Sequence, residues 1–305
     1  MITDFNSLQK DLPLFDKPTL AVAAAQDAYV LSAIRSAVNK NMAKAILIGS
    51  KAEIESIAEK ENISLDGIEI VDVSDKAAAC AAAVSLVRQG RAQAVMKGLV
   101  DTSVFLRAVL DKENGIRKAP LLSHVGVFEL PSFDRLITVT DAALNMYPNA
   151  DQKQSILENA REVQNALGVS NPIAACVCAI EKFNEKMPPT VDASELVRRN
   201  REGLIKGMRI IGPLALDNAL FVECAEHKGI TDPLAGRADI LLMPNIESGN
   251  VLYKSLAYIA GARNAGVLVG AGAPVVLTSR SDHEDTKLNS IALAMRLALY
   301  QRSHQ

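Results

Sequence analysis

The chain lacks the features that mark several large classes of protein. Its 305 residues carry a formal net charge of −2 and show no basic groove, so the composition gives no reason to expect nucleic acid as a partner. No apolar run is long enough to span a bilayer, and the first residues lack the basic head and apolar stretch of a secretion signal. We therefore expect a soluble cytoplasmic protein without a membrane segment.

Cysteine is scarce and is not arranged for metal or redox chemistry. The four cysteines each lie in an apolar context rich in alanine or valine, and none is paired in C-x-x-C spacing. We therefore predict reduced thiols in the core, rather than disulfides or a metal site, at Cys80, Cys176, Cys178 and Cys224.

Several motifs of common enzyme classes are absent. The sequence contains no G-x-x-x-x-G-K followed by Ser or Thr, no H-E-x-x-H and no G-x-S-x-G, which argues against P-loop hydrolases, the common zinc proteases and the nucleophile elbow. Gly270 and Gly272 resemble part of a dinucleotide turn, but position 275 of that pattern is valine. Clustered aspartates for a divalent metal are also missing, which argues against a metal-dependent dehydrogenase.

What the chain does contain is a regular alternation of strands and helices. From residue 19 to about 140 this rhythm predicts βαβ units and a largely parallel sheet covered on both faces. The apolar segments 121–130 and 135–140 follow each other without a helix, which favours a hairpin or an antiparallel edge. After residue 140 the alternation starts again, with strands and helices such as a helix over 214–229.

The length and this double alternation predict two α/β/α domains. We place the boundary at the turn-rich segment near Thr140 and expect the final helix to return to the first domain. The predicted domains are therefore 1–139 plus 278–305, and 140–277. Between Asp232 and Arg280, apolar strands alternate with glycine-rich turns, and the carboxyl ends of such strands are where α/β proteins bind ligands.

Six segments resemble the phosphate acyltransferase family, and in particular its butyryl-transferring branch. They cover roughly the C-terminal two-thirds of the chain in the family's order. They are MKGLVDTSVFLRAVL (96–110), TVTDAALNMYPNADQK (138–153), KMPPTVDA (186–193), GPLALDNA (212–219), DPLAGRADILLMPNIESGNVLYK (232–254) and GAPVVLTSR (272–280).

This resemblance implies a fold similar to that of isocitrate dehydrogenases, with the active site between two domains and with homodimers or higher homo-oligomers. It implies reversible transfer of a short-chain acyl group from acyl-CoA to inorganic phosphate, without a metal or redox cofactor. The acetyl-transferring branch reads GxPVNDLSRG where this chain reads GAPVVLTSRS, so butyryl-CoA is the expected substrate. Acetyl transfer, or a catalytically silent sensor of acyl-CoA, remains as an alternative.

By the same resemblance, Ser279 and Arg280 match the residues for substrate binding and catalysis. A guanidinium suits this role because it can bind phosphate through two parallel hydrogen bonds. Asp285 is the candidate general acid or base, with Asp282, His283 and Glu284 in reserve. The alternative for this acidic segment is a capping box, Ser281 with Glu284 or Asp282 with Asp285, that starts the last helix.

The segment 97–107 is expected to add charge and donors to the same site. Arg107 lies on a predicted helix whose counterpart in the family faces the cleft, and Lys97 ends the strand before it. Thr102 and Ser103 could cap this helix while its free N–H groups face an anion, although capping alone is an equally good interpretation. A lysine at a strand end is usually only solvated.

Two further segments are candidates for substrate binding. The loop Ser248, Gly249 and Asn250 precedes a predicted helix, whose N-terminus could hold a phosphate group. Asp141 and Asn145 lie in the boundary segment and could line the cleft from the second domain. Purely structural turns are the alternative for both segments.

Overall fold

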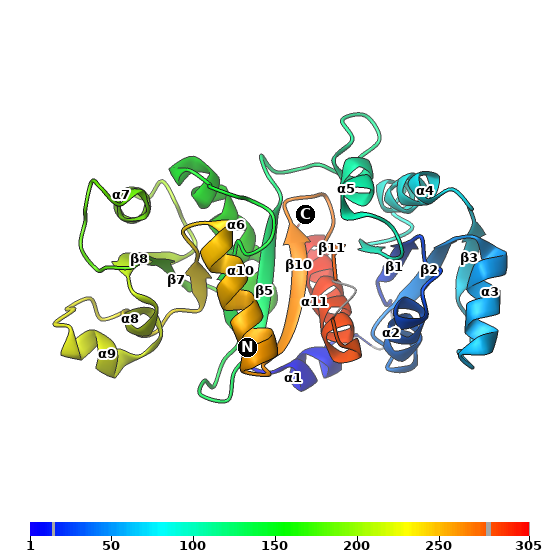
Figure 1. The fold of residues 1–305 in the computed structure, drawn as a ribbon, viewed down its shortest axis with the longest axis horizontal. Coiled ribbons are helices and arrows are strands. Elements are labelled where there is room, and N and C mark those ends of the chain that lie inside the picture. The colour runs from blue at the N-terminus through cyan, green and yellow to red at the C-terminus, as the bar shows by residue number, and fades with distance from the viewer. Residues whose placement is uncertain (14–15, 279–281, 305) are drawn as a thin grey trace. The chain divides into compact units, whose positions relative to one another are not determined.

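The structure is a computed structural model that describes residues 1–13, 16–278 and 282–304. The chain forms two compact units (Figure 1). The N-terminal unit consists of residues 5–120 and 265–305, and the central unit of residues 1–4 and 121–264. No helix within the described ranges combines the length and the hydropathy that a bilayer crossing needs.

The sheet of the N-terminal unit has the strand order β3-β2-β1-β4-β11-β10. All neighbouring strands are parallel except β10 and β11, which are antiparallel. Val22 of β1 lies beside Leu47 of β2 on one side and Met96 of β4 on the other. The central strand β1 is fully buried from Leu20 to Ala23, as expected for a parallel sheet covered on both faces. The strands are β1 (Thr19–Ala23), β2 (Lys44–Gly49), β3 (Glu69–Asp72), β4 (Ala94–Lys97), β10 (Arg263–Val269) and β11 (Val275–Val276).

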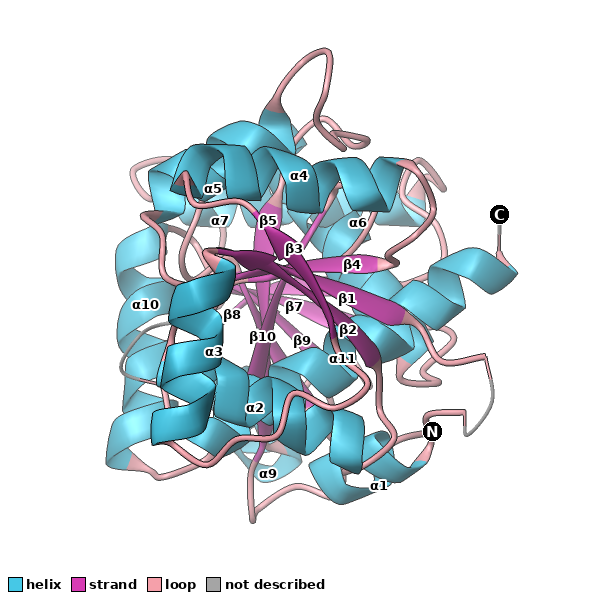
Figure 2. Cartoon of the chain, turned by 90° about the vertical axis from the view of Figure 1, so that its right-hand side faces the viewer, coloured by secondary structure: helices cyan, strands magenta, loops and turns pink. Residues whose placement is uncertain are grey.

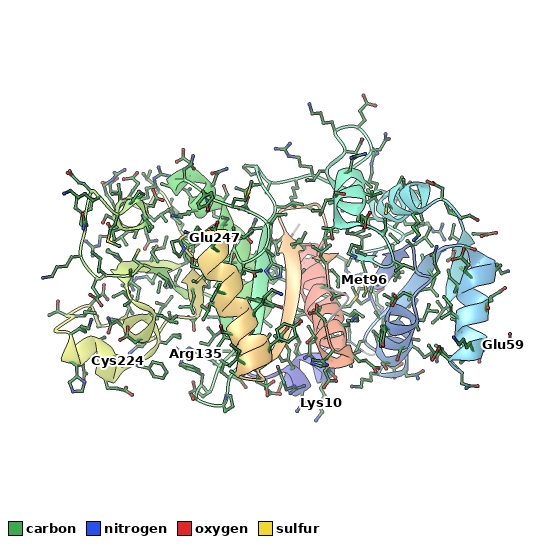
Figure 3. All side chains as sticks on the ribbon, viewed as in Figure 1. Lys10, Glu59, Met96, Arg135, Cys224 and Glu247 are labelled. Carbon is green, nitrogen blue, oxygen red and sulfur yellow. The ribbon has the colours of Figure 1, made fainter. Side chains whose placement is uncertain are left out.

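The helices of this unit cover both faces of its sheet. Helices α4 and α5 pack together, as do α2 and α11, and Figure 2 shows these pairs on opposite sides of the strands. Met96 on β4 is fully buried beneath them, whereas Lys10 and Glu59 are exposed (Figure 3). The helices are α1 (Phe5–Lys10), α2 (Ala28–Asn39), α3 (Lys51–Lys60), α4 (Lys76–Arg88), α5 (Thr102–Leu110) and α11 (Glu284–Ser303).

The central unit has the strand order β5-β6-β9-β7-β8. Strands β5 and β6 form the predicted antiparallel hairpin, with Val127 opposite Thr138, and the remaining neighbours are parallel. Its core contains Phe128, Val139 and Leu241. The strands are β5 (Ser123–Glu129), β6 (Ile137–Thr140), β7 (Ile173–Val177), β8 (Arg209–Leu214) and β9 (Ile240–Leu242).

One helix prediction in the central unit is wrong. The segment 214–229 forms two helices, because Phe221 has an extended backbone that places its ring 5.3 Å from the ring of Phe133. A π-helical turn, Ser255–Ile259, continues α10. The helices are α6 (Ala150–Ala166), α7 (Pro188–Arg201), α8 (Leu216–Leu220), α9 (Val222–His227) and α10 (Ile246–Lys254).

The two units divide the chain at other places than predicted. The predicted first domain, 1–139 plus 278–305, contains β5 and most of β6, but these strands pair with each other and β6 pairs with β9, so they belong to the central unit. The predicted second domain, 140–277, contains β11, which pairs with β4 of the N-terminal unit. The unit to which a hairpin belongs depends on the strands with which it pairs. A turn-rich sequence does not reveal those strands.

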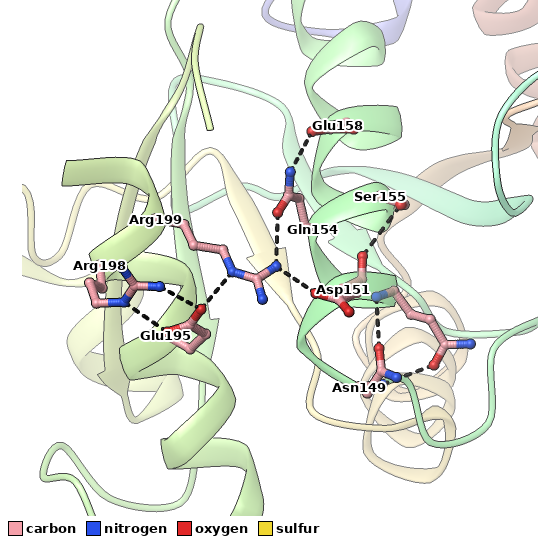
Figure 4. A network of polar contacts seen from close by, with 9 residues as sticks. Asn149, Asp151, Gln154, Ser155, Glu158, Glu195, Arg198 and Arg199 are labelled. Carbon is pink, nitrogen blue, oxygen red and sulfur yellow. Dashed lines mark hydrogen bonds and ion pairs between the residues drawn. The ribbon is translucent and has the colours of Figure 1, made fainter. Parts of the chain in front are cut away.

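Helices α6 and α7 are joined by a buried ion pair and by an exposed polar network. Lys153 Nζ lies 2.7 Å from Asp192 Oδ2, and the lysine side chain is 4% exposed. In the exposed network, Arg199 contacts Glu195 and Asp151, and Arg198 also contacts Glu195 (Figure 4). Hydrogen bonds from Arg198 and then Arg199 lower the pKa of Glu195 to about 2.

Candidate active site

Strands β1 and β4 of the N-terminal unit are parallel, so their carboxyl ends lie at one edge of the sheet. The chain after β4 stays close to the chain after β1, with Gly98 N donating to Ala23 O at 2.8 Å and Leu99 N to Ala24 O at 2.7 Å. A Cβ at position 98 would lie 2.2 Å from Ala24 O, so only glycine allows this approach. The edge is where parallel α/β sheets bind ligands.

A cavity of about 170 Å³ opens at this edge. Charged groups in its lining come from three different parts of the unit: Asp27 at the start of α2, Lys97 at the end of β4, and Lys287 in α11. Tyr29 and Thr278 also line it. Among the described residues, the lining thus contains two cationic side chains and one carboxylate.

Lys97, predicted from its position at a strand end, is not a solvated lysine. Its side chain is buried, and its Nζ donates to Gly98 O at 3.3 Å and to Val100 O at 3.1 Å. A buried ammonium group has to be compensated by hydrogen bonds or by an opposite charge. These hydrogen bonds hold the ammonium group of Lys97 at the carboxyl edge of β4.

The motif residues Ser279 and Arg280 lie outside the described residues. The chain reaches them from β11, which runs parallel to β4 with Val276 beside Met96. Thr278, the last residue described before the motif, is buried and lines the cavity.

The predicted acid or base, Asp285, is exposed in the first turn of α11. The capping box of Asp282 with Asp285 does not form, because the N-cap is His283 and its side chain makes no capping hydrogen bond. The alternative box with Ser281 falls on a residue outside the described ranges. Glu284 instead accepts hydrogen bonds from Ser32 at 3.2 Å and Ser36 at 3.1 Å, which tie α11 to α2.

The predicted donors on α5 are at the surface. Arg107, Thr102 and Ser103 are all exposed. The interpretation of Thr102 and Ser103 as caps is wrong, because the N-cap of α5 is Asp101, without a side-chain capping bond, and the two hydroxyl residues begin the helix itself. Their hydroxyls and Arg107 remain available to a ligand at this surface.

Asp141 and Asn145 hold a turn of the central unit. The carboxylate of Asp141, in a residue that is 3% exposed, accepts hydrogen bonds from the backbone N–H groups of His124, Ala143, Leu144 and Asn145 at 2.8 to 3.3 Å. The side-chain amide of Asn145 donates to Asp141 Oδ2 at 2.6 Å and to Leu122 O at 2.8 Å. These contacts give both side chains a structural role in the turn.

The sequence predicted that Ser248, Gly249 and Asn250 form a loop before a helix. This prediction is wrong, because the segment lies inside α10. The helix begins at Ile246, and Asn245 is the N-cap that accepts from Ser248 N at 3.0 Å. A Cβ at Gly249 would lie 2.5 Å from Asp141 O, so this glycine lets α10 pack on the Asp141 turn. Asn250 Nδ2 donates to Ala142 O at 3.1 Å, which fixes the same contact.

Sequence reasoning missed Lys287 as a residue of the cavity. A lysine in an amphipathic helix is normally assigned to the solvent face. Lys287, however, lies four residues before Ile291 and eight before Met295, and all three are buried. Its position on this apolar stripe is the sequence signal that could have identified Lys287 as buried.

Comparisons with known proteins place the whole chain in one family. Residues 9–82 and 76–295 match the family described as phosphate acetyl/butaryl transferase. Phosphate butyryltransferase of Clostridium acetobutylicum is 49% identical over 298 residues, which cover 98% of this chain and 99% of the relative. A probable phosphate butyryltransferase of Bacillus subtilis is 44% identical over 91% of this chain and 92% of the relative.

A solved structure agrees with these sequence matches. The crystal structure of a branched-chain phosphotransacylase from Enterococcus faecalis has a TM-score of 0.82 and 35% identity, and the match covers 92% of this chain and 99% of that chain. The fold and the sequence therefore define an α/β acyltransferase. This chain belongs to the phosphate acetyl/butyryl transferase family, whose members convert acyl-CoA and phosphate to acyl phosphate and CoA.

Proposed function

We propose that the chain reversibly transfers a butyryl group from butyryl-CoA to inorganic phosphate. The full-length similarity to phosphate butyryltransferases supports the choice of acyl group. The structural observation that carries the proposal is the cation-lined cavity at the carboxyl edge of β1 and β4, which Thr278 joins to the Ser279–Arg280 motif. A cavity with cationic side chains in its lining suits a phosphate substrate.

The reaction is a direct attack in a ternary complex. A phosphate oxygen bonds to the thioester carbonyl carbon, the carbonyl oxygen takes up negative charge, and the carbon–sulfur bond then breaks to release CoA as a thiolate. Holding the two substrates together can contribute about 7–11 kcal/mol, and a fixed donor to the oxyanion about 3 kcal/mol. Positioning and electrostatics thus supply the catalysis, with no metal or redox cofactor, and CoA acts as a substrate.

In this mechanism Arg280 binds the attacking phosphate through its guanidinium, and Ser279 donates to the reacting groups. Asp285 takes up or returns a proton, and its exposed position in the first turn of α11 leaves the carboxylate accessible. Arg107, Thr102 and Ser103 contribute donors from the exposed start of α5. Lys97 contributes positive charge from the end of β4.

We also propose that the enzyme is a cytoplasmic homodimer or higher homo-oligomer. On the central unit, Val251, Tyr258 and Ile259 are 67%, 47% and 85% exposed along α10 and the π-helical turn. The three residues lie within nine consecutive positions of α10 and its π-helical turn. Exposed apolar side chains gathered in one place are typical of an interface.

The decisive experiment follows thiol release from butyryl-CoA with a thiol-reactive dye, with and without inorganic phosphate, and repeats it with acetyl-CoA. The expected result is phosphate-dependent release that is faster with butyryl-CoA. Faster release from acetyl-CoA would identify a phosphate acetyltransferase instead. Binding of acyl-CoA without any release would identify a catalytically silent sensor.

Protein thiols should contribute little background to this assay. Burial raises the pKa of Cys80 to about 11, of Cys176 to about 12 and of Cys178 to about 11, so these side chains remain thiols at neutral pH. Cys224 is partly exposed. We expect one rapidly reacting thiol per folded chain and four after unfolding.

Substitution of Arg280 tests its role in binding the phosphate. Arg280→Ala should lower turnover by about a hundredfold or more, the scale for loss of one positioned charged donor. Arg302→Ala is the control, since Arg302 pairs with Asp16 on the surface of the same unit. Turnover of Arg280→Ala within about threefold of the wild type would contradict the assignment.

A further inference from the structure

The last helix of the N-terminal unit begins close to the family motif and carries the candidate acid or base. Helix α11 starts four residues after Arg280, and Asp285 is its second residue. Within the described residues, the N-cap His283 makes no side-chain capping hydrogen bond, and the first backbone bond of the helix, from Lys287 N to His283 O, is 3.2 Å long. Helix ends fray where their N–H groups lack partners, so the order of this turn depends on other contacts.

One contact between two helices anchors the start of α11. The carboxylate oxygen Oε1 of Glu284 accepts a hydrogen bond from Ser32 Oγ at 3.2 Å and another from Ser36 Oγ at 3.1 Å. The two serines are four residues apart on α2, so they lie on one face of that helix, one above the other. A single carboxylate oxygen thus joins the first residue of α11 to two successive turns of α2.

This contact is not what holds the whole of α11 on the unit. From its second turn onward the helix buries a series of apolar side chains, among them Leu288, Ile291 and Leu293, each 3% exposed or less. Together these side chains stabilise the docked helix far more than two hydrogen bonds at the surface can. The bonds of Glu284 therefore act on the first turn rather than on the docking of the helix.

The place of Glu284 in the helix connects it to the candidate acid or base. Successive side chains on an α-helix point about 100° apart, because each turn contains 3.6 residues. When Glu284 is bound to α2, the direction of the next side chain is therefore fixed as well. Asp285 is exposed, whereas the following residue, Thr286, is buried. The anchored turn thus presents the carboxylate of Asp285 to solvent in one defined direction.

We propose that Glu284 is a positioning residue, which holds the carboxylate of Asp285 in place for the reaction by binding Ser32 and Ser36. The inference rests on the proposed function, in which Asp285 takes up or returns a proton. Proton transfer requires the acid or base to lie within hydrogen-bond reach of the reacting group. A frayed first turn would spread Asp285 over many positions, and turnover would fall because few of them are productive.

Two other roles of Glu284 give different results. If Glu284 were itself the acid or base, its carboxyl group would be essential and an amide could not replace it. If it only stabilised the fold, its loss would lower the unfolding temperature and leave the turnover of the folded enzyme unchanged. Glu284→Gln and Glu284→Ala separate these roles, because the amide oxygen of glutamine can accept from both serines and alanine has no acceptor.

Turnover is measured as phosphate-dependent thiol release from butyryl-CoA. We expect Glu284→Ala to lower kcat about tenfold, which is part of the 10²- to 10⁴-fold that general acid–base catalysis contributes. The KM values for phosphate and butyryl-CoA should stay within about threefold, because substrate binding does not need the proton transfer. Ser32→Ala combined with Ser36→Ala should reproduce this loss, and Glu284→Gln should keep kcat within about threefold of the wild type.

Glu55→Ala is the matched control for these variants. Glu55 is also an exposed glutamate of the N-terminal unit, but it lies on α3, where its carboxylate is 3.7 Å from Lys51 Nζ. This control should keep the kcat of the wild type. A kcat of Glu284→Ala within about threefold of the wild type would overturn the proposal. So would a kcat of Glu284→Gln as low as that of Glu284→Ala.

A double-mutant cycle tests whether Glu284 acts through Asp285. Asp285→Asn should lower kcat about a hundredfold or more, the scale for a lost acid or base. On this background Glu284→Ala should cause less than about a twofold further loss. A tenfold loss on both backgrounds would overturn the proposal. If Asp285→Asn kept the kcat of the wild type, there would be no acid or base to position, and the proposal would fail while the reaction stands.

Hydrogen exchange follows the first turn of α11 independently of turnover. Glu284→Ala and the double serine variant should speed exchange of the Lys287 amide at least tenfold, whereas Glu284→Gln and Glu55→Ala should not. Unchanged protection of this amide in Glu284→Ala would show that the bonds to α2 do not order the turn, which would overturn the proposal. If the wild type releases no thiol, the proposed function fails, and exchange alone then decides whether Glu284 orders the turn.

Discussion

Both units of the molecule bury lysine side chains, and Lys153 and Lys287 differ in how their charges are compensated. Lys153 in the central unit lies 2.7 Å from the carboxylate of Asp192, so its charge is balanced within the fold. Lys287 in the N-terminal unit is buried to the same degree, but its contacts are a carbonyl oxygen and an aromatic face beside a cavity. The charge of Lys153 is thus balanced by a carboxylate, whereas the described contacts of Lys287 are with neutral groups.

Of the substitutions that test this comparison, removing the partner of Lys153 should change the stability most. Asp192→Asn keeps the shape of the side chain but leaves a buried ammonium without its counter-charge. We expect the free energy of unfolding to fall by about 3 kcal/mol, the lower end of the range for a broken buried pair, because Asp192 itself is 24% exposed. Urea unfolding at neutral pH measures this change.

A double substitution is the control for this prediction. Lys153→Met with Asp192→Leu replaces the whole pair by apolar side chains and should recover most of the lost stability. A loss of less than about 1 kcal/mol in Asp192→Asn would show that the pair contributes little. The contrast between the two lysines would then have no energetic basis.

A smaller effect is expected from Lys287→Met. Replacing a buried charge by an apolar group of similar size is often neutral or stabilising. We expect the free energy of unfolding, without ligand, to stay within about 1 kcal/mol of the wild type or to rise. A loss of about 2 kcal/mol or more would instead show that Lys287 stabilises the start of α11 through its hydrogen bond to Asp282 O.

The sequence predicted the architecture well where a pattern is local. The spacing of apolar residues and the polarity of the turns are sufficient to predict the parallel strands of the N-terminal unit and the hairpin of β5 and β6. The structure confirms both. Pairing between distant strands has no local signal. The assignment of the hairpin and of β11 to their units therefore depends on contacts that only the fold reveals.

The same distinction applies to the candidate site. Lys97 is the last residue of a buried strand, so its place at the carboxyl edge of the sheet could be predicted from the sequence. The segment Ser248–Gly249–Asn250 has the composition of a loop, yet its glycine is required where α10 approaches Asp141 O. Lys287 depends on which face of α11 is buried. Side-chain environment, rather than secondary structure, is thus what the sequence left undetermined.

The smallest effect is expected at the exposed network between α6 and α7. Glu195 accepts hydrogen bonds from Arg198 and Arg199, which lower its pKa from 4.5 to about 2. A carboxyl with a lowered pKa in the folded state contributes stability above its unfolded pKa, and this contribution is lost as the pH falls through the folded value. The contribution of Glu195 is therefore complete above pH 4.5 and disappears near pH 2.

Glu195→Gln tests this pH dependence. The variant should unfold at a slightly lower urea concentration than the wild type at pH 7, because exposed ion pairs contribute little. The difference should shrink steadily below pH 4.5. Asp192→Asn, measured from pH 7 down to pH 4.5, should lose much more stability than Glu195→Gln. The reason is that this substitution leaves the charge of Lys153 buried without its carboxylate partner. Equal losses in the two variants at neutral pH would mean that burial does not determine the strength of the contacts between α6 and α7.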